Sequence, residues 1–148
     1  MIGKWIRILY VIVAWLFPAA ILIQVFLVGL SLFTGQAYWS THRDLGHSLA
    51  VLPLLLIILS YLGRLPRSEK LLIWLLFGIY LVQAEVFAAI RADVPILAAF
   101  HPVLALVLFA LALIIALRAP TAVRTEVHTP STSQQHAPAE EKGPLAPD

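Results

Sequence analysis

The stretch ILYVIVAWLFPAAILIQVFLVGLSLF, residues 8–33, decides the fold class, because it exceeds the about 20 apolar residues that a helix needs to cross a bilayer. Lys4 and Arg7 precede it, as basic residues precede the apolar core of a secretory signal. Such a core is only about 7–15 residues long and ends at small residues. Here the apolar sequence continues beyond the small residues at 18–20. We therefore predict an uncleaved first membrane span.

The composition of the whole chain agrees with a fold surrounded mostly by lipid. Of its 148 residues, 61% are hydrophobic and 12% are charged. Soluble domains average roughly 45–50% apolar and about 25% charged residues. The chain has no cysteine, which excludes disulfides and thiolate metal ligands. The net charge of +2 gives no indication of a nucleic-acid partner. The expected partner is the lipid bilayer, because the chain is so rich in apolar residues.

Three further apolar runs follow the first and are separated by short polar turns. We predict an all-α, up-and-down four-helix bundle in the membrane, formed by residues 1–118. Its spans are expected at about residues 8–33, 44–62, 71–90 and 96–117. The start of the fourth span has two alternatives, because His101-Pro102 lies inside its apolar run and proline suits the first helical turn. The helix begins either near residue 96 or at Pro102, with 96–100 as an interfacial segment.

The segment 119–148 differs sharply in composition from the rest of the chain. It is rich in proline and almost free of large apolar residues, so we predict a disordered tail. His128 and His136 are expected to be solvated there.

The distribution of lysine and arginine predicts the orientation of the spans. With four spans, both termini lie on one side of the membrane. That side would hold Lys4, Arg7, Arg64, Arg67, Lys70, Arg118, Arg124 and Lys142. Only Arg43 and Arg91 would lie on the other side. We therefore expect both termini in the cytoplasm.

The sequence HRDLGH, residues 42–47, is the densest cluster of ionisable residues beside the apolar runs. Ionisable groups at a membrane are functional-site candidates. The second and fourth spans both run inward from the outer face, so His42 and His101 should enter at a similar depth. One imidazole from each of two helices is the arrangement that a bis-histidine haem needs. Gly46 and Ala105 follow the two histidines at helical spacing of four and would leave room for a planar macrocycle.

His47 is the alternative iron ligand. It lies about 140° around the helix from His42, so we expect the two side chains to face different surroundings. Arg43 would anchor to lipid headgroups or pair with a haem propionate. The competing interpretation is that these histidines are only solvated or cap helices, and that Asp44 is an N-terminal cap.

Glu85 lies inside the third span, about 8 Å from its outer end at 1.5 Å per residue. An unpaired carboxylate is costly there, so we expect it to be protonated or paired, in a structural or a proton-handling role. Its candidate partners are His47, His101 and Arg91. Gln24 and Gln83 are expected to form interhelical hydrogen bonds.

The chain resembles a family of small four-span bacterial membrane proteins of unknown function. Three sequence features carry this resemblance: HRDLG at 42–46, Gln83, and HPVLAL at 101–106. The layout of residues 8–117 also resembles one half of haem A synthase, a four-helix bundle like those of b-type cytochromes. There, an HR-x-x-G-type motif on the second helix and a histidine on the fourth hold haem. The resemblance implies haem b, with His42 and His101 as axial ligands, in the bacterial cytoplasmic membrane. Trp39 stands where the synthase has a glutamate, which argues against synthase activity.

Two main function hypotheses follow. The first is a small cytochrome-like protein that holds one haem near the outer face and passes electrons to other membrane redox proteins. The second is a cofactor-free accessory or structural subunit of a membrane assembly. A transporter is a third hypothesis, with only Glu85 in its favour. The sequence has no P-loop, HExxH motif or serine-nucleophile elbow, so a redox-active chain would be an electron carrier rather than a catalyst.

Overall fold

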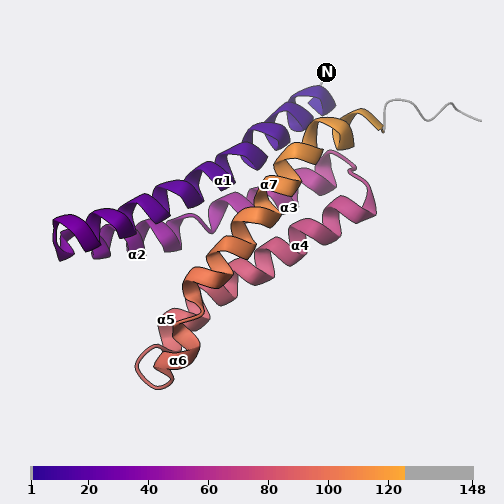
Figure 1. Ribbon diagram of the computed structural model, residues 1–148. Helices are drawn as coiled ribbons and strands as arrows, with labels where there is room; N and C mark the ends of the chain where they lie inside the picture. Colours follow the sequence, from indigo (N-terminus) through magenta and orange to yellow (C-terminus); the bar gives the residue numbers. More distant parts are fainter. Residues whose placement is uncertain (1, 126–148) are drawn as a thin grey trace, which may run out of the picture.

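The computed structural model describes residues 2–125, and within this range every regular element is helical (Figure 1). Four stretches are long and apolar enough to cross a membrane: residues 3–34, 39–62, 67–90 and 95–123. This confirms the prediction of an all-α, multi-pass membrane protein with four spans. The predicted tail from 126 to 148, with His128 and His136, lies outside the described residues.

Each predicted span corresponds to one long helix or to a broken one. The first is α1 (Ile2–Thr34), which is followed by a short 3₁₀-helix, η1 (Gln36–Tyr38). The second consists of α2 (Trp39–Ser48) and α3 (Val51–Leu62). The third consists of α4 (Arg67–Leu81), the π-helix η2 (Val82–Val86) and α5 (Phe87–Ile90). The fourth consists of α6 (Pro95–Ala98) and α7 (His101–Thr125).

The second span breaks between α2 and α3 because of Pro53. Proline has no amide hydrogen to donate to the carbonyl four residues before it, and its ring crowds that turn. At the break, the amide of Ala50 donates to the carbonyl of His47 at 3.2 Å rather than to that of Gly46. The carbonyl of Gly46 instead accepts a hydrogen bond from the Tyr80 hydroxyl of α4, which also lies 3.3 Å from the His47 carbonyl. A side chain of the third span therefore satisfies the broken turn of the second.

The fourth span has a helix start within one residue of each predicted starting point, and its last helix extends further than predicted. Helix α7 begins at His101, one residue before the proline, and the short helix α6 occupies most of the predicted interfacial segment. At its other end α7 continues through Pro120 to Thr125, into the segment predicted as tail. Packing explains the extension: Ala119 and Ala122 are buried, and Arg7 of α1 donates to the carbonyl of Val123 at 2.8 Å.

The core lies where all four spans meet. Helix α1 packs against α3 and α7, and α4 packs against the same two helices. The fully buried side chains there include Tyr10, Phe17, Leu56, Ile73, Leu76 and Ile115. Away from this core the molecule opens, because α1 and α2 diverge from α4, α5 and α7 toward the end that carries α5 and α6 (Figure 1).

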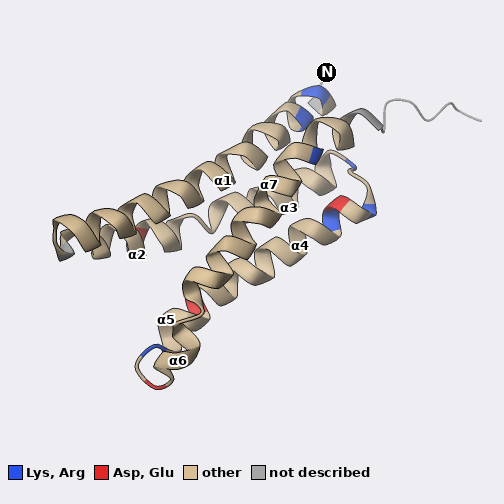
Figure 2. Cartoon of the chain, in the orientation of Figure 1, with Lys and Arg blue, Asp and Glu red and all other residues tan. Residues whose placement is uncertain are grey.

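The two ends of the molecule differ in charge. Lysine and arginine gather at the end where α1 begins and α7 ends (Figure 2). There, Arg118 of α7 pairs with Glu69 of α4 at 2.7 Å, and Glu69 is only 3% exposed. The opposite, open end carries His42, His47 and His101, and of the described lysines and arginines it carries Arg43 and Arg91.

Candidate functional site

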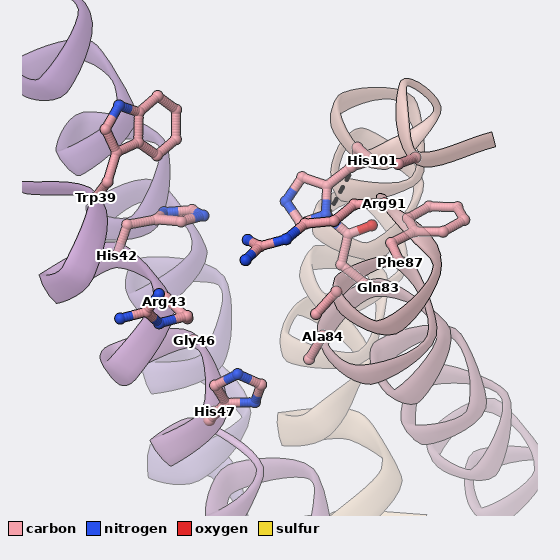
Figure 3. Close-up of a pocket in the computed structure, with 12 residues that line it drawn as sticks. Trp39, His42, Arg43, Gly46, His47, Gln83, Ala84, Phe87, Arg91 and His101 are labelled. Carbon is pink, nitrogen blue, oxygen red and sulfur yellow. Dashed lines mark hydrogen bonds between the residues drawn. The ribbon is translucent and has the colours of Figure 1, made fainter. Parts of the chain in front are cut away.

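A pocket of about 330 Å³ lies at the open end, between α2 and the wall formed by η2, α5 and the turns that follow (Figure 3). Helix α2 supplies Trp39, His42, Arg43, Gly46 and His47. The opposite wall consists of Gln83, Ala84, Phe87, Ala88, Arg91, Ala98 and His101. The pocket therefore brings together most of the residues that the sequence analysis selected, from three of the four spans.

His42 and His101 face each other across this pocket. Their ring centroids are 6.2 Å apart, with ring planes at 69°, and both rings project into the gap from opposite walls (Figure 3). Trp39 lies edge-on to His42 at 5.9 Å, and Phe87 lies 6.3 Å from His101. The structure thus places the two predicted axial histidines as a pair, flanked by one aromatic ring on each side.

The backbone of α1 orients the His42 ring. Its Nδ1 lies 3.2 Å from the carbonyl oxygen of Gln24. A carbonyl oxygen can only accept, so Nδ1 carries the hydrogen and donates it. In the neutral imidazole Nε2 then holds a free lone pair. This is the pattern by which metal-binding histidines are held, with one nitrogen tied to a carbonyl and the other available to a ligand.

Gln83 holds the first residue of α7 in place. Its Nε2 donates to the carbonyl of His101 at 2.9 Å, so the predicted interhelical hydrogen bond is present. Gln83 lies within the π-helix η2, and π turns inside α-helices occur frequently at functional sites. Within residues 2–125, its buried Oε1 has no hydrogen-bond partner.

His47 lies within hydrogen-bonding distance of Glu85, so among the predicted partners of this carboxylate the structure places His47 beside it. The His47 Nδ1 lies 2.8 Å from Glu85 Oε1, and both side chains are about half exposed. The expectation that His47 faces away from the pocket of His42 is wrong, since both line it. The reason is that the pocket is a groove that runs along α2. It therefore contacts residues on more than one face of this helix.

Two predicted residues contribute differently from expectation. Ala105 does not line the pocket; Ala84, Ala88 and Ala98 are the small residues of its far wall. Gln24 takes part through its backbone carbonyl, and among the described residues its buried side-chain amide has no hydrogen-bond partner. Gly46 lines the pocket as predicted, and a Cβ atom there would lie 3.5 Å from the amide nitrogen of Gln24.

Two arginines lie on opposite walls of the pocket. Arg43 was selected from the sequence, and its Nε lies 3.4 Å from Asp44 Oδ1 in an exposed pair. Arg91 was considered only as a partner for Glu85, yet it lines the pocket and reaches into it (Figure 3). Its position directly after the third span was the available signal, because an ionisable group beside a membrane span is a functional-site candidate.

Residues 24–89 match the model of a family of unknown function (DUF6220). No curated protein and no solved structure matches the chain. The resemblance to haem A synthase therefore stays a prediction. The matched segment includes the HRDLGH cluster, Tyr80, Gln83 and Glu85, and it stops before His101. From Gln24 in α1 to Ala89 in α5, the chain is thus similar to a family of unknown function (DUF6220), in agreement with the predicted resemblance to a family of this kind.

Proposed function

We propose that this protein binds one b-type haem in the pocket, with His42 and His101 as axial ligands, and carries electrons within the membrane. The separation of the two rings is the observation that carries this proposal. An iron–nitrogen bond of about 2 Å on each side, with each ring centre lying somewhat beyond its nitrogen, sets the centroids roughly 6 Å apart. The observed separation is 6.2 Å.

The donor set of the pocket also favours haem over a bare metal ion. Within residues 2–125, no group of three or more histidine, cysteine, aspartate or glutamate side chains is placed to hold a metal ion. A structural metal such as zinc usually takes three or four protein ligands. A haem iron needs only axial ligands from the protein and supplies one-electron redox chemistry when bound. Two facing imidazoles are sufficient for that purpose.

The chain's own residues would perform three tasks at this site. The carbonyl of Gln24 holds His42 with its Nε2 directed away from α1. Gln83 ties the start of α7, and with it His101, to the third span. Trp39 and Phe87 shield the two imidazoles with apolar surface. A low-dielectric surrounding of this kind is one of the factors that set a haem potential.

The proposal includes an orientation in the bacterial cytoplasmic membrane. The gathering of lysine and arginine at one end (Figure 2) supports placing both termini in the cytoplasm. The pocket would then lie near the outer face, where other membrane redox proteins could exchange electrons with it.

One group of contacts favours the second candidate function, a cofactor-free accessory subunit. The hydrogen bonds from Tyr80 to Gly46, between His47 and Glu85, and from Gln83 to His101 all join helices at the open end. These polar groups could serve only to hold the bundle together, as interhelical hydrogen bonds do in other membrane proteins.

The visible spectrum of the detergent-purified protein, before and after dithionite, separates the two candidates. His42→Ala and His101→Ala should each abolish or shift the Soret band while circular dichroism shows unchanged helix content. His47→Ala is the matched control, because the ring that faces His101 is that of His42 and not that of His47, and it should keep the band. If wild-type protein supplied with haem shows no Soret band, the haem proposal fails and the accessory role stands. If only His47→Ala loses the band, the ligand assignment is wrong.

A further inference from the structure

The residues that line the pocket include two arginines and no aspartate or glutamate. Five basic side chains line it: His42, Arg43, His47, Arg91 and His101. Glu85 projects toward the same region, and it is paired with His47 at 2.8 Å. The two guanidinium groups are permanently charged. Among the described residues, neither guanidinium group has an ion pair with a carboxylate of the opposite wall.

Arg43 has only a weak partner. Its Nε lies 3.4 Å from the carboxylate of the adjacent Asp44, and both side chains are more than half exposed. Exposed pairs of this kind contribute little free energy. A guanidinium has five N–H donors, and this contact uses one of them. The remaining donors of Arg43 are available to a ligand.

The Arg91 side chain has no hydrogen bond or ion pair within residues 2–125. It follows α5 directly, and its guanidinium extends from the far wall into the gap between His101 and His42 (Figure 3). Arg91 is exposed, so its guanidinium is accessible to a ligand that enters the pocket. Its direction into the pocket, rather than away from the protein, places its N–H donors where a ligand in the pocket can accept them.

We propose that Arg43 and Arg91 form an anion-binding mouth that receives carboxylate groups of the bound ligand. This inference rests on the proposed haem site, and it adds that the site selects a ring bearing free acid groups over a neutral one. Arginine suits this role because its planar fork matches a carboxylate with two parallel hydrogen bonds. A lipid phosphate offers the same oxygen chemistry, so the test must separate the two sources.

The test compares haem with haem dimethyl ester, in which both carboxylates are blocked. Each is titrated into the detergent-purified full-length protein and followed by the Soret band. Wild type should bind the free acid about tenfold or more tightly than the ester, the factor expected for hydrogen bonds to a charged group. Arg91→Gln and Arg43→Gln should weaken binding of the free acid and leave ester binding unchanged. Arg67→Gln, at the opposite end of α4, is the matched control and should behave as wild type.

The possible results separate the two proposals. If wild type binds neither compound, the haem site itself fails. If wild type binds both equally, or Arg91→Gln weakens both equally, haem binding stands and the anion-binding mouth is refuted. Repeating the titration in nanodiscs of neutral or anionic phospholipid distinguishes the sources of the anion. Loss of the free-acid preference only in anionic discs would assign the mouth to lipid phosphate and overturn the proposal.

Discussion

Replacement of Tyr80 by phenylalanine tests how the broken second span is held to the third. The substitution removes one hydroxyl group and keeps the ring, which is 4% exposed and packs near Phe17. The hydroxyl donates to the carbonyl of Gly46, whose usual helical donor, the amide of Ala50, has turned to His47 instead. Phenylalanine would therefore leave this carbonyl without its donor and create almost no cavity.

The expected cost follows from two bounds. A buried polar group left without a partner costs about 1–3 kcal/mol. Interhelical hydrogen bonds in membranes average about 0.6 kcal/mol and reach about 1.7 kcal/mol. Because Gly46 is only partly buried, we expect a loss of about 1–2 kcal/mol in the free energy of unfolding, measured by SDS titration in mixed micelles. The control is Tyr38→Phe at an exposed tyrosine, which should change stability little. Equal losses for both variants would refute the assigned role of Tyr80.

Three further predictions concern the opposite end and the topology. Breaking a buried ion pair typically costs about 3–5 kcal/mol in the free energy of unfolding. Arg118→Ala should cost less than this, because Arg118 is half exposed. Adding Glu69→Gln should recover most of the loss in the same SDS titration. Truncation after Thr125 should leave the thermal unfolding temperature in detergent unchanged, whereas truncation after Ala119 should lower it, because the last turns of α7 contact Arg7. A reporter inserted between α1 and α2 should read external and one fused after α7 should read cytoplasmic; a cytoplasmic reading from the first would reverse the proposed orientation.

The fold was largely predictable from the sequence because the bilayer imposes a length on each apolar run. The predicted spans and the observed helices agree in number and order. Two of the differences occur where proline is involved, whereas the first and second spans begin five or six residues earlier than predicted. Pro53 divides the second span, and Pro120 is accommodated within α7 because its neighbours are buried against the rest of the bundle. A local preference against helix was therefore outweighed by packing that the sequence alone does not display.

The pairing of the two histidines was predictable because it depends on how deeply each lies along its span. His42 and His101 were paired from topology alone, and the structure brings their rings together. The surroundings of His47 were not predictable from a helical wheel, because the opposite wall determines which α2 residues meet it. Arg91 was missed as a pocket residue for the same reason: its direction depends on the geometry of η2 and α5.

The π-helix η2 amounts to one additional residue in the third span. A regular α-helix turns by about 100° per residue, so deleting one residue from 82–86 would rotate all later side chains of this span by roughly that angle. Phe87 and Arg91 would leave the pocket, while the apolar length needed for membrane insertion would hardly change. Such a chain would keep its four spans and acquire a different binding surface. Among proteins that share the 24–89 match, the length of this segment should therefore separate those with this pocket from those without it.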